Sequence, residues 1–288
     1  MAKEPSVAPI PEGAVVKIVN STMLDDAMSY TANRIRNKTG GTDQIAWDSA
    51  KGFGDAVDAI SSGGGNPFEV FESLQSFGLS NKSTITEFVA NIPNVTSLRY
   101  SFAVSFANPL TRIELTVSDK LTDVSFMLGN MASYYLNEIV FKGNFSKVKN
   151  VATAFACSGT GISDALKKIT GLDFTSVTNA SNVFAAQRGL TDIEIKANTV
   201  NVSLDLSYQP HLNIASCVNV LNALKDRTGQ DALTLTLNTG LKTADTGMIY
   251  ANYVKLDAST NLYVSCESTE AGAVTIAAAI TAKNWTIA

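Results

Sequence analysis

Residues Val177–Val200 read VTNASNVFAAQRGLTDIEIKANTV, and the spacing of apolar residues changes halfway along this stretch. In the first half, up to Phe184, apolar residues are three or four positions apart, as on one face of a helix. The second half, LTDIEI from Leu190, has the pattern of a short buried strand. A helix and a strand within about two dozen residues are typical of a supersecondary repeat, so the same pattern should recur along the chain.

The strand half of this stretch occurs four times, with the pattern L-x-x-I. The copies are LTRIEL at Leu110, LNEIVF at Leu136, LKKITGL at Leu166 and LTDIEI at Leu190, which are 26, 30 and 24 residues apart. An apolar segment with helical spacing precedes each copy: Val95–Phe102, Leu121–Leu128, Val148–Phe155 and Val177–Phe184. One unit has too small an apolar face to fold alone, so neighbouring units must stack to complete a core. The repeats therefore predict a solenoid.

These units resemble the leucine-rich repeats of the BspA-like type, in which V-T-x-x-x-x-x-F precedes L-x-x-I-x-L. The resemblance covers roughly Ile85 to Leu237. It implies an α/β repeat fold, a short leucine-rich-repeat solenoid that acts as an interaction scaffold without chemistry of its own. Phe102, Phe155 and Phe184 occupy the core position that ends three of the four apolar segments.

We place the solenoid at residues 85–240 and a β-rich C-terminal cap at 241–288. Within the cap, Thr246–Ser268 has the pattern of added strands, and Ser268 or Thr269 is the expected start of the last helix. Upstream, three of the seven prolines lie in the first twenty residues, so we expect an N-terminal arm at residues 1–22.

A helical hairpin that serves as an attachment module is expected at residues 23–60, before the solenoid. The sequence SSGGGNP at Ser61–Pro67 then has the composition of a flexible linker. We assign residues 61–84 to this Gly-rich linker and the lead-in to the first repeat.

The segment Ala32–Ile60 resembles one that recurs in tail proteins of phages of Gram-positive bacteria, with the form I-R-x-K-T-G-x-T-D-x-I followed by a short helix. The matching residues, with one extra glycine at Gly41, are Ile35, Arg36, Lys38, Thr39, Gly40, Thr42, Asp43 and Ile45. The segments His211–Asn238 and Ala278–Ala288 resemble the terminal unit of the same phage proteins, in which a longer helix and two last strands close the solenoid.

The resemblance implies a non-enzymatic structural or binding protein of a phage tail tip or baseplate, or of a phage-tail-like particle. Such a protein would be located in the virion and assembled in the host cytoplasm. We expect its partners to be other tail and baseplate proteins, further copies of the same chain, and a host cell-wall glycan.

Two other classes of protein stay open. A bacterial BspA-like surface adhesin is the main alternative, although we find neither a signal peptide nor a C-terminal wall-sorting or membrane segment. A glycan-active enzyme would need a carboxylate pair, which only a structure can reveal.

Composition excludes several other classes. The chain has 288 residues, 45% of them hydrophobic, which is enough for a substantial core. A net charge of −4 without Lys/Arg clusters argues against a nucleic-acid partner. No apolar run reaches the roughly 18 residues of a membrane span. Cys157, Cys217 and Cys266 have neither disulfide nor metal-ligand spacing, so we expect free thiols in a reducing cytosol.

Candidate site residues are few. We expect no catalytic, cofactor-binding or metal-binding residues, and the single histidine, His211, is expected to be an exposed turn residue. Tyr134 and Tyr135 are the candidate binding residues, because SYYL falls in the link that precedes a predicted strand. Exposed rings there can stack on a sugar or pack on a neighbouring chain. The alternative is partial burial under the link.

Overall fold

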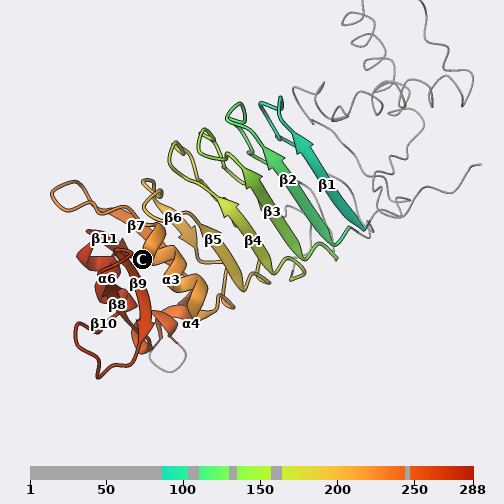
Figure 1. Ribbon diagram of the computed structural model, residues 1–288. Helices are drawn as coiled ribbons and strands as arrows, with labels where there is room; N and C mark the ends of the chain where they lie inside the picture. The colour runs from blue at the N-terminus through green and yellow to red at the C-terminus, as the bar shows by residue number, and fades with distance from the viewer. Residues whose placement is uncertain (1–85, 103–109, 130–134, 157–163, 244–246) are drawn as a thin grey trace, which may run out of the picture.

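The structure is a computed structural model that describes residues 86–102, 110–129, 135–156, 164–243 and 247–288 (Figure 1). The predicted arm (1–22), helical hairpin (23–60) and linker (61–84) lie outside the described residues, and so does Tyr134. The fold described below is therefore that of the predicted solenoid and its cap.

Five parallel strands lie side by side in chain order and form the main sheet (Figure 1). They are β1 Glu87–Ile92, β2 Arg112–Val117, β3 Glu138–Gly143, β4 Lys168–Leu172 and β5 Asp192–Ile195. The last four each begin two residues after the leucine of an L-x-x-I copy. Each repeat supplies one strand, and the described repeats form a parallel β-solenoid.

The repeat residues stack in register through the solenoid. Ile113 pairs with Ile139, Ile139 with Ile169 and Ile169 with Ile193. These isoleucines and the leucines at the start of each L-x-x-I copy are at most 2% exposed. Burying one such side chain contributes about 1.5–3 kcal/mol, so the four copies supply much of the core.

The apolar segments before the strands are turns, and the prediction that they are helices is wrong. In each segment one residue has left-handed backbone, which interrupts a right-handed helix. These residues are Tyr100, Phe126, Thr153 and Asn182, with φ between 54° and 56°. The predicted core positions of the segments are nevertheless buried, Phe102, Phe155 and Phe184 completely.

Hydrogen bonds between successive turns replace those of the predicted helices. The N–H of Leu98 donates to the carbonyl of Asp123 over 2.8 Å, and Val124 donates to Asn150 over 3.0 Å. Within a turn, a short polar side chain accepts a backbone N–H two residues later, as Asp123 Oδ1 does from Ser125 over 2.9 Å. Such local bonds compete with helix formation. The equivalent acceptors in the other turns are Ser97, Asn150 and Asn179.

Two smaller sheets and four helices form the C-terminal part of the described chain (Figure 1). The parallel sheet contains β6 Leu204–Leu206, β7 Leu233–Leu237 and β11 Trp285–Ile287, in the order β11-β7-β6. The antiparallel sheet contains β8 Tyr253–Asp257, β9 Leu262–Cys266 and β10 Val274–Thr275, in the order β10-β8-β9. The helices are α3 Ile214–Ala223, α4 Thr239–Lys242, α5 Met248–Ala251 and α6 Ile276–Ala282.

The predicted closing elements are present, with one error in position. The longer helix is α3, and the two closing strands are β7 and β11. They pair with each other, although the predicted boundary between solenoid and cap, at residue 240, lies between them in the chain. The last helix starts at Ile276, not at Ser268 or Thr269. The chain cannot be helical earlier, because Gly272 has left-handed backbone with a φ of 78° and the next residues of β10 pair with β8. The N-cap of the helix is Thr275.

Helix α3 closes the end of the main sheet with its polar side chains. Ser216 Oγ accepts the N–H of Ile193 over 2.9 Å and donates to the carbonyl of Thr191 over 3.1 Å. One turn further, Asn219 Oδ1 accepts the N–H of Ile195 over 2.8 Å. The helix thus supplies hydrogen-bond partners to backbone N–H and C=O groups at the edge formed by β5, where another strand would otherwise pair. An uncovered edge would invite pairing with another chain.

Asn219→Leu should lower the free energy of unfolding by about 1–3 kcal/mol, because the N–H of Ile195 loses its acceptor. Urea unfolding at neutral pH measures the change. Asn219→Asp is the matched control, since it keeps an oxygen at the same place and should cost less. Equal losses in the two variants would contradict the role of Asn219 as the partner of β5.

Candidate interaction surface

The outward side of the main sheet carries a row of alternating charges. Side chains alternate between the two faces along a strand, and the first residue of each of the five strands lies on the face opposite the core. The row runs across the strands as Glu87, Arg112, Glu138, Lys168 and Asp192, which are partners in register. Adjacent strands are about 4.8 Å apart, so unlike charges in register attract and like charges would repel.

Three residues of this row, Arg112, Glu138 and Lys168, form a connected network with Glu114 and Lys142 on the same face, and we call these five residues the charged ladder. Arg112 Nε donates to Glu138 Oε2 over 2.8 Å, and Lys168 Nζ lies 3.0 Å from Glu138 Oε1. Glu114 accepts from both Arg112 and Lys142. Its side chain is only 11% exposed, so the two cations offset the cost of shielding its charge from water.

The cations of the charged ladder keep its glutamates ionised. The hydrogen bond from Lys142, with that from Arg112, holds the pKa of Glu114 below its usual range. For Glu138 the bond from Arg112 lowers the pKa most, followed by the bond from Lys168. Both carboxylates therefore remain charged, hydrogen-bonded acceptors in mildly acidic solution.

Acid should weaken the fold through the charged ladder. The glutamates have folded-state pKa values below the usual 4.5, so their pairing stabilises the fold above about pH 4.5 and is lost as the pH falls through the folded pKa. Each pair is partly exposed and should contribute at most about 1 kcal/mol. Urea unfolding between about pH 7 and pH 3.5 should show a smaller acid loss for Glu114→Gln with Glu138→Gln than for the native chain. The same acid loss in both proteins would contradict this role.

The row of alternating charges has a signal in the sequence that apolar spacing does not reveal. The third residue of the four L-x-x-I copies is Arg112, Glu138, Lys168 and Asp192, so its charge alternates from one copy to the next. This alternation has physical meaning only if the strands are parallel and in register, which the structure shows.

Tyr135, the described member of the predicted tyrosine pair, lies just before β3 and is 57% exposed. More than half of this residue is therefore exposed, and the rest is covered, so the alternative of partial burial under the link also stays open. Leu136 beside it is only 2% exposed, so the chain enters the core directly after the tyrosine. A binding role for Tyr135 stays a prediction.

Groups with catalytic or metal-binding chemistry are dispersed. In the parts of the chain that the structure describes, no three His, Cys, Asp or Glu residues are grouped so as to hold a metal ion. His211 is exposed in the turn before α3, as predicted. Cys217 and Cys266 are free thiols, and burial raises the pKa of Cys217 to about 12. The thiol of Cys217 therefore stays protonated and unreactive near neutral pH.

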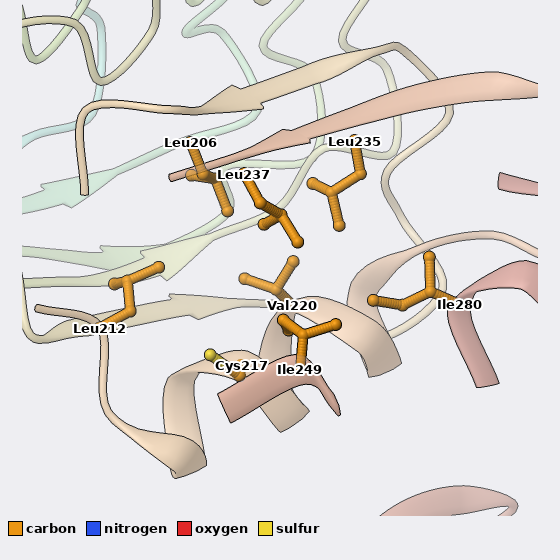
Figure 2. Close-up of a pocket in the computed structure, with 8 residues that line it drawn as sticks. All are labelled: Leu206, Leu212, Cys217, Val220, Leu235, Leu237, Ile249 and Ile280. Atoms are coloured by element: carbon orange, nitrogen blue, oxygen red, sulfur yellow. The ribbon is translucent and has the colours of Figure 1, made fainter. Parts of the chain in front are cut away.

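A small apolar cavity lies next to Cys217, between the β6-β7 strands and helices α3, α5 and α6 (Figure 2). The space open to the centre of a water molecule is about 10 Å³. This is at the lower limit for one water, which would also need two or more polar partners. The lining is Leu206, Leu212, Cys217, Val220, Leu235, Leu237, Ile249 and Ile280, so the cavity is a packing gap and no ligand site.

None of the described helices is long and apolar enough to cross a membrane. No family model, curated protein or solved structure matches this chain. The assignment of a function therefore rests on the residues of the chain itself.

Proposed function

We propose that this chain is a non-enzymatic structural and binding protein of a phage tail tip or baseplate, or of a phage-tail-like particle, of Gram-positive bacteria. The observation that carries the proposal is the ordered match of Ile35–Ile45 to the tail-protein form I-R-x-K-T-G-x-T-D-x-I. In this proposal residues 23–60 attach the chain to other tail proteins, and copies of the chain associate in the assembled virion.

The solenoid supports a role as a scaffold. Its strands are in register, both glutamates of its charged ladder are paired with cations of the same chain, and α3 covers the last strand of the main sheet. Together with the L-x-x-I spacing, these features favour BspA-like leucine-rich repeats that present a surface to a partner. Each repeat of a solenoid contacts only its neighbours, through a shared core, so residues on the outer surface can vary without loss of the core packing.

The charged ladder also speaks against the glycan-active enzyme. A glycosidase needs one carboxylic acid that remains protonated near neutral pH, which requires a raised pKa. In the ladder, the pKa values of both Glu114 and Glu138 are lowered by cations that already occupy their oxygens. These two groups are poorly suited to donate a proton or attack a sugar.

Locating the chain in intact particles tests the proposed function. The full chain should be found in tail tips or baseplates by cryo-electron microscopy, after assembly in the host cytoplasm. A variant with Arg36→Ala, Lys38→Ala and Asp43→Ala should remain folded but should not be incorporated. The matched control is Lys147→Ala with Lys149→Ala on the solenoid, which should be incorporated normally.

Recovery of the chain from the cell envelope and not from particles would overturn the proposal and favour the BspA-like surface adhesin. Normal incorporation of the triple variant would overturn the attachment role of residues 23–60. Circular dichroism of the purified variants separates either result from a failure to fold.

A further inference from the structure

Two stacked aromatic rings and a guanidinium meet on the turn side of the solenoid, and we call this group the Arg99 cluster: Arg99, Tyr100 and Phe126. The rings of Tyr100 and Phe126 are 5.3 Å apart at an angle of 29°. The guanidinium carbon of Arg99 lies 5.2 Å from the centre of the Tyr100 ring and 5.4 Å from that of Phe126. Both contacts are within the range of a cation–π interaction.

Both rings stand at positions where the backbone favours a different residue. Tyr100 and Phe126 have φ of 56° and 54°, in the left-handed region that bulky side chains avoid. The equivalent residues in the later turns are Thr153 and Asn182, and asparagine tolerates this conformation well. Backbone preference therefore does not account for the two aromatic residues.

Core packing does not account for them either. Each of these turns already inserts its own buried residue into the core, Phe102 in the first and Leu128 in the second, at 0% and 1% exposure. Tyr100 and Phe126 are only partly buried, and Arg99 is exposed. The positive φ is common to all four turns, so what distinguishes the first two is the aromatic side chains placed there.

Gly129 leaves room for the aromatic pair. A β-carbon on Gly129 would lie 3.3 Å from Cδ1 of Tyr100 and 3.0 Å from the carbonyl oxygen of Phe126. These separations are tighter than most real contacts, so a larger residue would displace the Tyr100 ring. The glycine therefore leaves space for the Tyr100 ring beside Phe126.

The guanidinium of Arg99 is positioned to receive an anion. Within the described residues it forms no ion pair, whereas Arg112 is held by Glu114 and Glu138. A guanidinium has five N–H donors in a plane that matches a carboxylate or a phosphate. The rings restrict its motion, so less rotational freedom is lost when an anion binds.

We propose that the Arg99 cluster binds an acidic saccharide. A sugar ring packs on the accessible part of the aromatic pair, and its carboxylate or phosphate accepts hydrogen bonds from Arg99. This inference deepens the proposed function, since it assigns the host-surface ligand of a tail protein to a class of acidic glycan. One such site is weak, and many copies on a particle would make attachment firm.

The test measures binding to the purified full-length chain, so it does not depend on where the chain is assembled. Saturation-transfer NMR and calorimetry compare a hyaluronan hexasaccharide, neutral cellohexaose and a hexaglutamate peptide. We expect the acidic saccharide to bind with a dissociation constant on the order of 1 mM and more tightly than the other two. Glucuronate and glucose 6-phosphate then show whether carboxylate or phosphate is preferred.

Arg99→Gln should weaken binding of the hexasaccharide about tenfold or more, because a charge-assisted hydrogen bond is lost. Tyr100→Asn with Phe126→Asn should abolish binding and leave the chain folded, since asparagine suits both backbone positions. Thr153→Asn is the matched control, with the same backbone change outside the cluster and unchanged binding.

Four results would overturn the inference. The first is that none of the three acidic sugars binds. The second and third are that cellohexaose binds as tightly as the hyaluronan hexasaccharide, or that hexaglutamate binds more tightly than it does. The fourth is that the Arg99→Gln variant binds the hexasaccharide as tightly as the native chain. Hexaglutamate as the best ligand would point to an acidic protein partner. None of these results depends on the location of the chain in particles, which tests the proposed function separately.

Discussion

Phe155→Ala should lower the free energy of unfolding by about 3–5 kcal/mol, the usual cost of truncating a fully buried phenylalanine. Phe155 is 0% exposed and its ring stacks on Phe184 with centres 5.7 Å apart and planes at 15°. It also lies next to Phe141, with ring centres 6.2 Å apart. The substitution therefore leaves a cavity between consecutive repeats, and urea unfolding measures the loss.

The loss should extend over neighbouring repeats, because each turn is bonded to the next. The N–H of Phe155 donates to the carbonyl of Val183 over 3.0 Å, and Leu128 donates to Ala154 over 3.0 Å. Hydrogen exchange should consequently quicken at both amides. Tyr135→Ala is the control, since the ring is 57% exposed and its removal should change stability by about 0.5 kcal/mol or less. Equal effects of the two substitutions would contradict a core role for Phe155.

Gly171→Ala should cost about 2–5 kcal/mol, for two additive reasons. Gly171 has a φ of 80°, where any L-residue costs about 1–2 kcal/mol. In addition, a β-carbon would overlap the backbone carbonyl oxygen of Phe141 on the neighbouring strand. Relieving such an overlap usually costs about 1–3 kcal/mol more. The glycine lies where the register of β4 and β5 shifts, between Ile169 and Leu172.

Gly229→Ala separates the two contributions. Gly229 has nearly the same φ, 79°, but no atom lies within 4 Å of the place its β-carbon would take. This control should cost only the backbone part, about 1–2 kcal/mol. Urea unfolding of both variants at one pH gives the comparison. A Gly171→Ala loss no greater than that of Gly229→Ala would show that β3 and β4 are not as close as described.

The sequence by itself determined the repeat, the strands and the core. The leucine and isoleucine of each L-x-x-I copy are buried, and so are Phe102, Phe155 and Phe184. These predictions succeeded because burial depends on which side chains are apolar and how they are spaced, both of which are written in the chain. The exposure of His211 and Tyr135 followed from the same reasoning, since both fall in links between elements.

Only the tertiary structure decided the backbone of the segments that precede the strands. Apolar residues three or four positions apart fit a helix face as well as they fit these turns. The turns form because stacked neighbours supply their hydrogen-bond partners, as Asp123 does for Leu98. The charged ladder, the contact of Asn219 with β5 and the Arg99 cluster arise for the same reason. Each joins residues more than twenty positions apart, such as Arg112 with Glu138 or Tyr100 with Phe126, and the register of the stacked repeats brings them together.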